Sequence, residues 1–490
     1  MTARWILNRA ASHPEAVALT SIHTKKEWTY QELCGEIGKW QQVFRECGLR
    51  QGDRLCVLSQ NRPELFAVLF ACGLSGILYV PLNYRLSQPE LKSIIADCTP
   101  VFIVTDALNA ETASAISDCP AMLLESVGAA GSAGEASEEV KADGDDPWTI
   151  LYTGGTTGLP KGAVLSFANM NWNALNTIVS WSLTGQDVTV NYMPMFHTGG
   201  LNALSLPVLM AGGTVAVGDR FEPTEALQAV LDYRATVSLF VPTMHQLMTE
   251  TPLFSEAVFH DPVLFLSGGA PCPAVIYDRY RGKGIPFKEG YGLTEAGPNN
   301  FSIPPETALK KRGAVGKSMQ FNEVRVVLPD GTAAGTGEVG ELQLRGPHII
   351  QRYWNNENAT AAAFRDGWLC TGDLARTDEE GDLYIVGRSK DMIISGGENI
   401  YPQEVEKCLM EFPGIKDAAV VGVPHERWGE AVTAFIIPVH GPPFDEKALI
   451  DHCRRRLGGY KVPKRFIPVT DFPKTHIGKV DKKQLALNGK

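Results

Sequence analysis

Hydrophobic residues alternate between the strand period and the helical period along the first 118 residues of the chain. Residues 54–58 and 101–105 are short apolar runs typical of buried strands, whereas residues 30–47 and 64–74 have the apolar spacing of helices. Regular alternation of this kind is typical of α/β proteins with a parallel sheet. The first part of the chain is therefore predicted to adopt such a fold.

The rest of the chain divides into further regions by the same criteria. Strand and helix patterns alternate again over residues 148–273, and short β runs separated by glycine-rich turns fill residues 322–345. The charged segment after residue 387 is large enough for a separate α/β domain. We therefore expect an N-terminal domain over residues 1–389 and a C-terminal domain over residues 390–490.

Composition excludes several classes of protein. Apolar residues make up 44% of the chain, which is too many for a disordered protein, and the net charge of −10 argues against wrapping nucleic acid. The uncharged run at 65–82 is interrupted by glycine and proline, so we expect a buried helix and strand there and no transmembrane segment. The ten cysteines include no C-x-x-C pair and the N-terminus lacks a signal peptide, which favours a cytoplasmic location.

A glycine- and threonine-rich loop at residues 152–162 follows a predicted strand. Glycines let the backbone approach a phosphate, threonine hydroxyls add donors, and Lys161 supplies a positive charge. A flexible surface loop would explain glycine and threonine alone, but a lysine between a proline and a glycine favours phosphate binding. The spacing differs from that of a Walker A loop.

This loop, Thr153-Gly-Gly-Thr-Thr-Gly-Leu-Pro-Lys-Gly162, resembles the signature of the AMP-forming acyl-adenylate superfamily, which contains acyl-CoA synthetases, adenylation domains and luciferases. Further matches follow in the order of that family: Tyr192-Met-Pro-Met-Phe-His197, Ser267-Gly-Gly-Ala-Pro271, Gly290-Tyr-Gly-Leu-Thr-Glu295, Trp368-Leu-Cys-Thr-Gly-Asp373, Gly387-Arg388 and Pro473-Lys-Thr-His-Ile-Gly-Lys479. Seven motifs in one order make chance an inadequate explanation.

The resemblance implies a fold, a reaction and a set of cosubstrates. We expect a large N-terminal domain with two α/β sheet layers and a small β unit, followed by a smaller, mobile C-terminal α/β domain. The enzyme is expected to use ATP, Mg²⁺ and coenzyme A to convert a carboxylic acid first to an acyl-AMP and then to a thioester. Gly154 stands where the family usually has serine, which removes one hydroxyl donor from the phosphate loop.

The same resemblance assigns roles to individual residues. Lys479, Glu295, Thr294 and His197 are the expected catalytic residues, with Lys479 bridging the carboxylate and the α-phosphate and His197 gating the acyl pocket. Lys390 is the expected hinge. Thr156 and Glu295 are the expected Mg²⁺ ligands. The expected cosubstrate-binding residues are Thr153, Gly154, Gly155, Thr156, Thr157, Lys161, Gly269, Ala270, Gly290, Tyr291, Gly292, Thr294, Asp373, Ile385, Arg388, Gly396 and Gly397, the last two lining a tunnel for pantetheine.

The segments expected to line the acyl pocket contain no lysine or arginine; they are residues 191–212, 238–245, 267–271 and 290–301. A second substrate carboxylate would therefore be buried without a partner, at a cost of about 3 kcal/mol or more, which disfavours malonate-like and succinate-like acids. Amino acids are disfavoured because Phe196-His-Thr198 stands where their adenylation domains place an aspartate. Fatty acids and aryl or cinnamyl acids both remain open.

The sequence is compatible with three functions to different degrees. A carboxylate–CoA ligase of fatty acid or aryl acid metabolism fits best, because eleven basic residues against three aspartates over 451–490 suit the phosphates of coenzyme A. An enzyme that loads a carrier-protein pantetheine is the alternative. A non-catalytic nucleotide-binding protein is disfavoured because the expected reactive residues are all present. The sequence leaves open whether the chain forms a homodimer.

Overall fold

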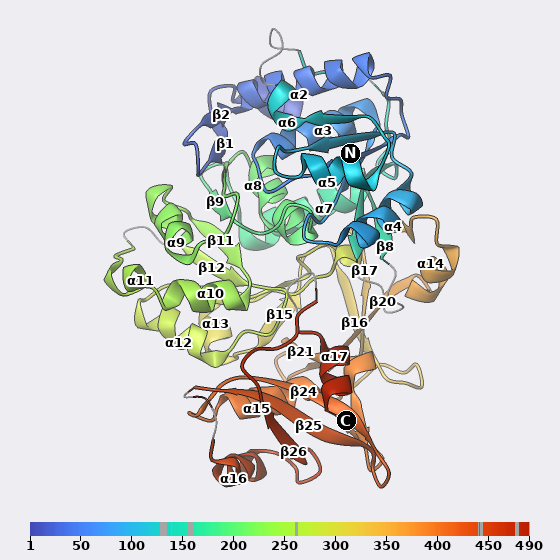
Figure 1. Ribbon diagram of the computed structural model, residues 1–490. Helices are drawn as coiled ribbons and strands as arrows, with labels where there is room; N and C mark the ends of the chain where they lie inside the picture. Colours follow the sequence, from blue (N-terminus) through green and yellow to red (C-terminus); the bar gives the residue numbers. More distant parts are fainter. Residues whose placement is uncertain are drawn as a thin grey trace. The chain divides into compact units, whose positions relative to one another are not determined.

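The computed structural model describes residues 1–127, 135–138, 140–153, 160–259, 263–439, 441, 444–475 and 480–489. The chain forms two compact units (Figure 1). The first contains Met1–Val324 and Leu344–Leu369, and the second contains Arg325–Gln343 and Cys370–Lys490. The mixed α/β fold is the predicted one, whereas the predicted domain boundary at residue 390 stays a prediction.

The first unit is built on a seven-stranded sheet with the order β18-β8-β7-β4-β3-β5-β6. Strands β4, β3, β5 and β6 are parallel to their neighbours, and β7 pairs antiparallel with β8. The strands are β3 (Arg54–Leu58), β4 (Leu78–Pro81), β5 (Phe102–Thr105), β6 (Ala121–Leu123), β7 (Pro147–Thr153), β8 (Lys161–Ser166) and β18 (Arg352–Tyr353).

Two smaller sheets complete the α/β part of the first unit. One has the order β2-β1-β10-β9 and the other has three parallel strands, β11-β12-β13. Their strands are β1 (Val17–Ser21), β2 (Glu27–Thr29), β9 (Val188–Asn191), β10 (Thr214–Val217), β11 (Val237–Phe240), β12 (Leu264–Ser267) and β13 (Phe287–Glu289). Short strands β14 (Phe301–Ser302) and β15 (Ala314–Ser318) pair antiparallel, as do β19 (Phe364–Arg365) and the first residues of β20 (Trp368–Thr377).

The helices of this unit form where the sequence combines caps with apolar spacing. Thr29 and Glu32 form a reciprocal capping box at the start of α2, which packs beside α3 (Figure 1). The helices are α1 (Trp5–Ser12), α2 (Tyr30–Glu46), α3 (Glu64–Ser75), α4 (Gln88–Cys98), α5 (Ala110–Ile116), α6 (Leu124–Val127), α7 (Phe167–Trp181), α8 (Ser205–Ala211), α9 (Pro223–Asp232), α10 (Pro242–Thr249), α11 (Pro252–Glu256), α12 (Ala274–Gly282), α13 (Pro305–Lys310) and α14 (Glu357–Ala363), with a π-helix η1 (Gly199–Ala203) and a 3₁₀-helix η2 (Thr294–Ala296).

The uncharged run at residues 65–82 is the predicted buried helix and strand. All residues of α3 after Glu64 are buried, and β4 follows directly after the turn at Gly76. Within the described part of the chain, no helix is long and apolar enough to cross a membrane.

The second unit has its own core. A five-stranded sheet contains β22 (Ile393–Ser395), β23 (Glu398–Ile400), β24 (Ile415–His425), β25 (Gly429–Pro438) and β26 (Arg465–Pro468). Helices α15 (Pro402–Met410) and α16 (Glu446–Arg456) contribute Val405, Leu409 and Leu449 to the core of this unit. The remaining elements are β16 (Glu323–Val327), β17 (Gly340–Arg345), β21 (Leu383–Arg388), the 3₁₀-helix η3 (Ser389–Asp391) and α17 (Lys482–Asn488).

Trp148 on β7 ties the central sheet to its helices, which makes it a direct test of the core. It is fully buried between Phe70 and Phe167, and its indole N–H donates a 2.9 Å hydrogen bond to the Leu69 carbonyl. We expect Trp148→Ala to lower the free energy of unfolding by about 3–5 kcal/mol, measured by urea denaturation. Trp148→Phe should cost less because it keeps an aromatic ring; equal stability of wild type and Trp148→Ala would contradict this packing.

Candidate active site

The predicted phosphate loop connects two antiparallel strands of the central sheet. Thr153 ends β7 and lies opposite Lys161, the first residue of β8. The Thr153 hydroxyl donates a hydrogen bond of 3.4 Å to the Lys161 carbonyl. The ends of the loop are therefore held together by the sheet. Four predicted loop residues lie outside the described residues, namely Gly154, Gly155, Thr156 and Thr157.

Lys161 and Glu295 are 134 positions apart in the sequence, but both contact the same tyrosine. The ammonium of Lys161 lies 5.6 Å from the ring centre of Tyr353, and the Tyr353 hydroxyl donates a 2.8 Å hydrogen bond to Glu295 Oε1. Burial, with Glu295 beside it, raises the pKa of Tyr353 far above its usual value, so the hydroxyl remains a donor. The structure thus brings a cation and a carboxylate together at the phosphate loop.

The donor set at Glu295 suits magnesium. Mg²⁺ is usually bound by one or two carboxylates together with substrate phosphates and water, rather than by a cage of protein ligands. Among the described residues no group of three or more acidic, histidine or cysteine side chains could form such a cage. Glu295 Oε2 has no hydrogen-bond partner among them, and Thr294 lies beside it in η2. Glu295 therefore fits the expected role of metal ligand.

The remaining nucleotide residues predicted in the first unit follow the ends of two parallel strands. Ser267 of β12 lies opposite Glu289 of β13, so the loops with Gly269 and Ala270 and with Gly290, Tyr291 and Gly292 begin at the same edge of the sheet. Glu289 accepts hydrogen bonds from the Cys272 amide (2.9 Å) and the Tyr277 hydroxyl (2.6 Å). This carboxylate therefore braces the first loop against the second.

The close packing of the chain at position 292 allows only glycine, independently of any bound nucleotide. A Cβ at this position would lie 2.2 Å from the Pro298 backbone, too close for any side chain. The chain thus turns tightly between Tyr291 and η2. The ring of Tyr291 lies 5.8 Å from that of Phe301.

His197 lies next to an irregular helix. It is half-buried and precedes the π-helix η1, an element often found at functional sites. Gly200 packs against the Pro194 carbonyl, where a Cβ would approach within 2.3 Å. Phe196, beside His197, contacts the ring of Tyr84 edge-on at 5.4 Å. An aromatic surface therefore adjoins the predicted gate of the acyl pocket.

The second unit contains the other predicted residues. Asp373 and Arg388 lie opposite one another on β20 and β21, with Arg388 Nε 3.0 Å from Asp373 Oδ1, and Ile385 is half-buried on β21. Lys390 lies exposed in η3. Gly396 and Gly397 have φ of 62° and 88° and form the two-residue turn between β22 and β23. Lys479 lies outside the described residues.

Sequence reasoning missed two residues, Tyr353 and Lys288. Lys288 on β13 is only 5% exposed, and its ammonium lies 4.4 Å from the ring centre of Trp181 on α7. Burial lowers the pKa of Lys288 to about 8. The segments expected to line the acyl pocket thus contain no cation, but a buried lysine stands two residues before one of them. No sequence motif marks either residue.

Comparison with known proteins adds an independent line of evidence. A family model described as AMP-binding enzyme matches residues 6–354, and one described as AMP-binding enzyme C-terminal domain matches residues 404–479. Feruloyl-CoA synthase of Amycolatopsis sp is 38% identical over 97% of this chain and 96% of that protein. Indoleacetate–CoA ligase of Aromatoleum aromaticum is 34% identical over 98% and 96%.

Two solved structures are similar to this chain over nearly the whole length of both proteins. The ATP-bound MatB of Rhodopseudomonas palustris has a TM-score of 0.92 at 32% identity and covers 100% of this chain and 99% of its own. The o-succinylbenzoate CoA synthetase MenE of Bacillus subtilis, in complex with the acyl-adenylate intermediate OSB-AMP, has a TM-score of 0.89 at 31% identity, covering 98% and 97%.

Lys288 gives the folded protein a pH-dependent stability. Its pKa falls from 10.5 in the unfolded chain to about 8 in the folded one, so between these pH values the unfolded chain binds more protons and stability rises with pH. We expect Lys288→Met to stabilise the protein by about 3 kcal/mol below pH 8, because 1.36 kcal/mol corresponds to one pKa unit. The gain should shrink toward pH 10.5.

Chemical denaturation of both proteins across this pH range measures the effect. Lys317→Met, which removes an exposed lysine of the same unit, is the matched control for the loss of a lysine side chain. A pH-independent difference between wild type and Lys288→Met would contradict a buried, destabilised ammonium.

Proposed function

The chain belongs to the family of AMP-binding enzymes, and from this premise we propose that it joins an aryl monocarboxylic acid to coenzyme A through an acyl-AMP intermediate. As a member of this family it is an AMP-forming acid–thiol ligase that uses ATP, Mg²⁺ and coenzyme A. We propose in particular that the acid is an aryl acid and that the thiol is coenzyme A rather than a carrier-protein pantetheine.

One observation in the structure supports the adenylation chemistry most strongly. Lys161 at the phosphate loop and Glu295 are held by a single side chain, Tyr353. Adenylation brings a carboxylate to the α-phosphate of ATP, so two anions must approach one another while pyrophosphate leaves. A lysine and a carboxylate suited to Mg²⁺, held at one place, are the groups that this approach needs.

In the first step, one carboxylate oxygen of the acid attacks the α-phosphorus and the bond to pyrophosphate breaks. Lys161, Thr294 and the loop amides bind the phosphate oxygens, and Glu295 with Thr156 would hold Mg²⁺, which would supply charge neutralisation on the triphosphate. Lys479, by its motif, contacts both the carboxylate and the α-phosphate. Positive charge aimed at the transition state then lowers the barrier.

In the second step, the thiol sulfur of coenzyme A attacks the acyl carbonyl carbon, its proton is lost to solvent, and AMP departs with the bridging oxygen. Asp373 accepts hydrogen bonds from the ribose hydroxyls, and Arg388 binds the ribose or phosphate. The turn at Gly396 and Gly397 has no side chains to obstruct the narrow pantetheine arm. Rotation about Lys390 exchanges the arrangement for the first step with that for the second.

An aryl acid is favoured over a fatty acid by two observations. The two relatives described above are named for ferulate and indoleacetate, both aryl acids. The predicted gate at His197 adjoins the rings of Phe196 and Tyr84, which can pack edge-on against a substrate ring.

We also propose a cytoplasmic location, because all ten cysteines are free thiols, the form that a reducing compartment maintains.

A panel of acids tests the proposed substrate class. With ATP, Mg²⁺ and coenzyme A, kcat/KM for ferulate, cinnamate or indoleacetate should exceed that for palmitate, and should exceed that for malonate by about 100-fold, because the second carboxylate of malonate lacks a partner in the pocket. AMP, pyrophosphate and acyl-CoA are the products to be measured. Formation of ADP would contradict the ligase class itself.

Two further comparisons test the proposed acid and the proposed thiol separately. A kcat/KM for malonate above that for every aryl acid would contradict the proposed substrate class. If Lys288→Met then abolished the activity with malonate, the buried lysine would be identified as the partner of the second carboxylate. Replacing coenzyme A with a phosphopantetheinylated carrier protein should lower the rate of thioester formation. Faster transfer to the carrier protein would favour the alternative thiol.

The two half-reactions should be separable by mutation. Lys479→Ala should slow adenylate formation by about 10²- to 10³-fold, as expected for the loss of one preorganised electrostatic contact, while thioester formation from synthetic acyl-AMP largely survives. Lys390→Pro should mainly slow thioester formation, because a fixed φ opposes rotation at the hinge. Equal slowing of both half-reactions by both substitutions would contradict alternation between two arrangements.

A further inference from the structure

Tyr353 lies where three segments that are distant in the sequence meet. It belongs to β18, which pairs antiparallel with β8, so Tyr353 stands opposite Ala163, two residues beyond Lys161. Its hydroxyl donates to Glu295, and its ring faces the Lys161 ammonium. None of the seven motifs that carry the family resemblance contains Tyr353.

The backbone around Tyr353 is fixed from both sides. The Ile350 amide donates a 2.9 Å hydrogen bond to the Glu295 carbonyl, and the Trp354 amide donates one of 2.7 Å to the Gly162 carbonyl. The Tyr353 amide itself donates to the Thr360 hydroxyl at 3.0 Å. These three hydrogen bonds hold the backbone in place on both sides of the Tyr353 side chain.

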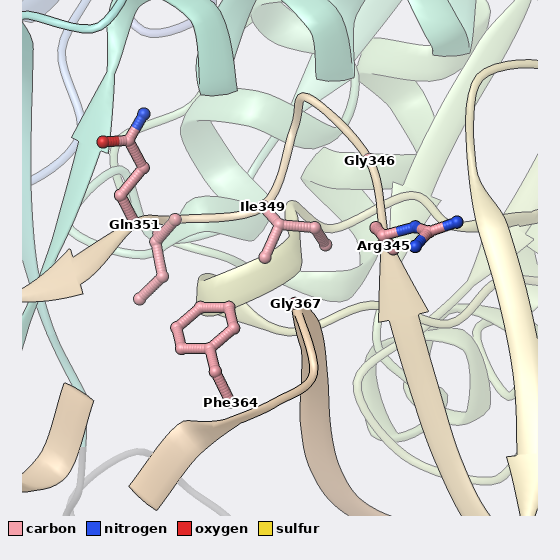
Figure 2. Close-up of a pocket in the computed structure, with 7 residues that line it drawn as sticks. Arg345, Gly346, Ile349, Gln351, Phe364 and Gly367 are labelled. Carbon is pink, nitrogen blue, oxygen red and sulfur yellow. The ribbon is translucent and has the colours of Figure 1, made fainter. Parts of the chain in front are cut away.

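The segment that precedes Tyr353 is anchored in turn by apolar contacts (Figure 2). Ile349 and Phe364 point toward one another at a pocket of about 340 Å³, while the guanidinium of Arg345 points away from it. Arg345 pairs instead with Glu323 and stacks on Trp368, 4.5 Å from its ring centre. Apolar side chains thus line most of the pocket beside Gln351, and Arg345 is paired with Glu323.

The two contacts of Tyr353 act on different parts of the predicted site. The hydrogen bond occupies Oε1 of Glu295 and orients the carboxylate so that Oε2 is left for another partner. The ring face attracts the Lys161 ammonium and limits the space that this long side chain explores. One side chain thus sets both the position of the carboxylate and that of the lysine.

We propose that Tyr353 is a positioning residue that holds the Glu295 carboxylate and the Lys161 ammonium in place for the metal–triphosphate part of ATP. It touches neither reacting atom, and it acts through these two partners. The inference rests on the proposed function, since that function supplies ATP and Mg²⁺ as the groups to be bound.

Tyr353→Phe separates this role from packing, because it removes only the hydroxyl. The concentration of Mg²⁺ at half-maximal ATP–pyrophosphate exchange should rise about tenfold, as expected for the loss of a hydrogen bond to a charged group. At saturating Mg²⁺, kcat should fall by less than about threefold. Tyr353→Leu also removes the ring, so it should raise KM for ATP about threefold to tenfold above that of Tyr353→Phe.

Metal binding provides a readout that does not depend on turnover. Mn²⁺ binding to the complex of the enzyme with a non-hydrolysable ATP analogue, followed by electron paramagnetic resonance, should weaken about tenfold in Tyr353→Phe. In a Glu295→Gln background the same substitution should have no further effect, because the two residues act as one unit. Unchanged Mn²⁺ affinity in Tyr353→Phe, or full additivity with Glu295→Gln, would overturn the proposal.

Tyr30→Phe is the control for a purely structural effect. Tyr30 is buried, and its hydroxyl donates to the carbonyls of Leu209 and Gly213 at 3.0 and 2.8 Å, so its loss should reduce stability without changing the Mg²⁺ constant. Absence of acid-dependent exchange by the wild-type protein would instead contradict the proposed function. The Mn²⁺ measurement would still decide the role of Tyr353 in that event.

Discussion

The hydrogen bond from Tyr353 to Glu295 joins the phosphate-loop strand to the segment that carries the candidate metal ligand. Backbone hydrogen bonds from Ile350 to the Glu295 carbonyl and from Trp354 to the Gly162 carbonyl connect the same two segments. A charged acceptor makes the bond from Tyr353 stronger than one between neutral groups. Preorganised electrostatics of this kind are worth most when the groups need not move as the reaction proceeds. Tyr353 is held by a strand of the central sheet, and its hydrogen bond in turn holds the Glu295 carboxylate in one position.

The predicted site residues belong to both units of the chain. Groups suited to phosphate and metal, Lys161 and Glu295, are held within the first unit, whereas the Asp373–Arg388 pair belongs to the second. The second also contains the predicted hinge at Lys390 and the Gly396–Gly397 turn.

Local patterns predicted many elements but few of the interactions that matter for the site. Strand β3 occupies residues 54–58 as predicted, because a buried parallel strand reads as a continuous apolar run. Tyr353 could not be assigned a role, since its hydrogen-bond partner lies 58 residues earlier and depends on the pairing of β18 with β8. The burial of Lys288 could not be predicted, because a lone lysine in a strand is usually exposed. It depends on the packing of Trp181, which is distant in the sequence.

The transfer of oxygen from the acid to AMP tests the central claim most directly. The enzyme would be given an aryl acid with both carboxylate oxygens replaced by ¹⁸O, together with ATP, Mg²⁺ and coenzyme A, and the products would be weighed by mass spectrometry. Attack of the carboxylate on the α-phosphorus predicts one ¹⁸O in each AMP and none in pyrophosphate. Unlabelled AMP, or label in pyrophosphate or inorganic phosphate, would contradict an acyl-AMP intermediate.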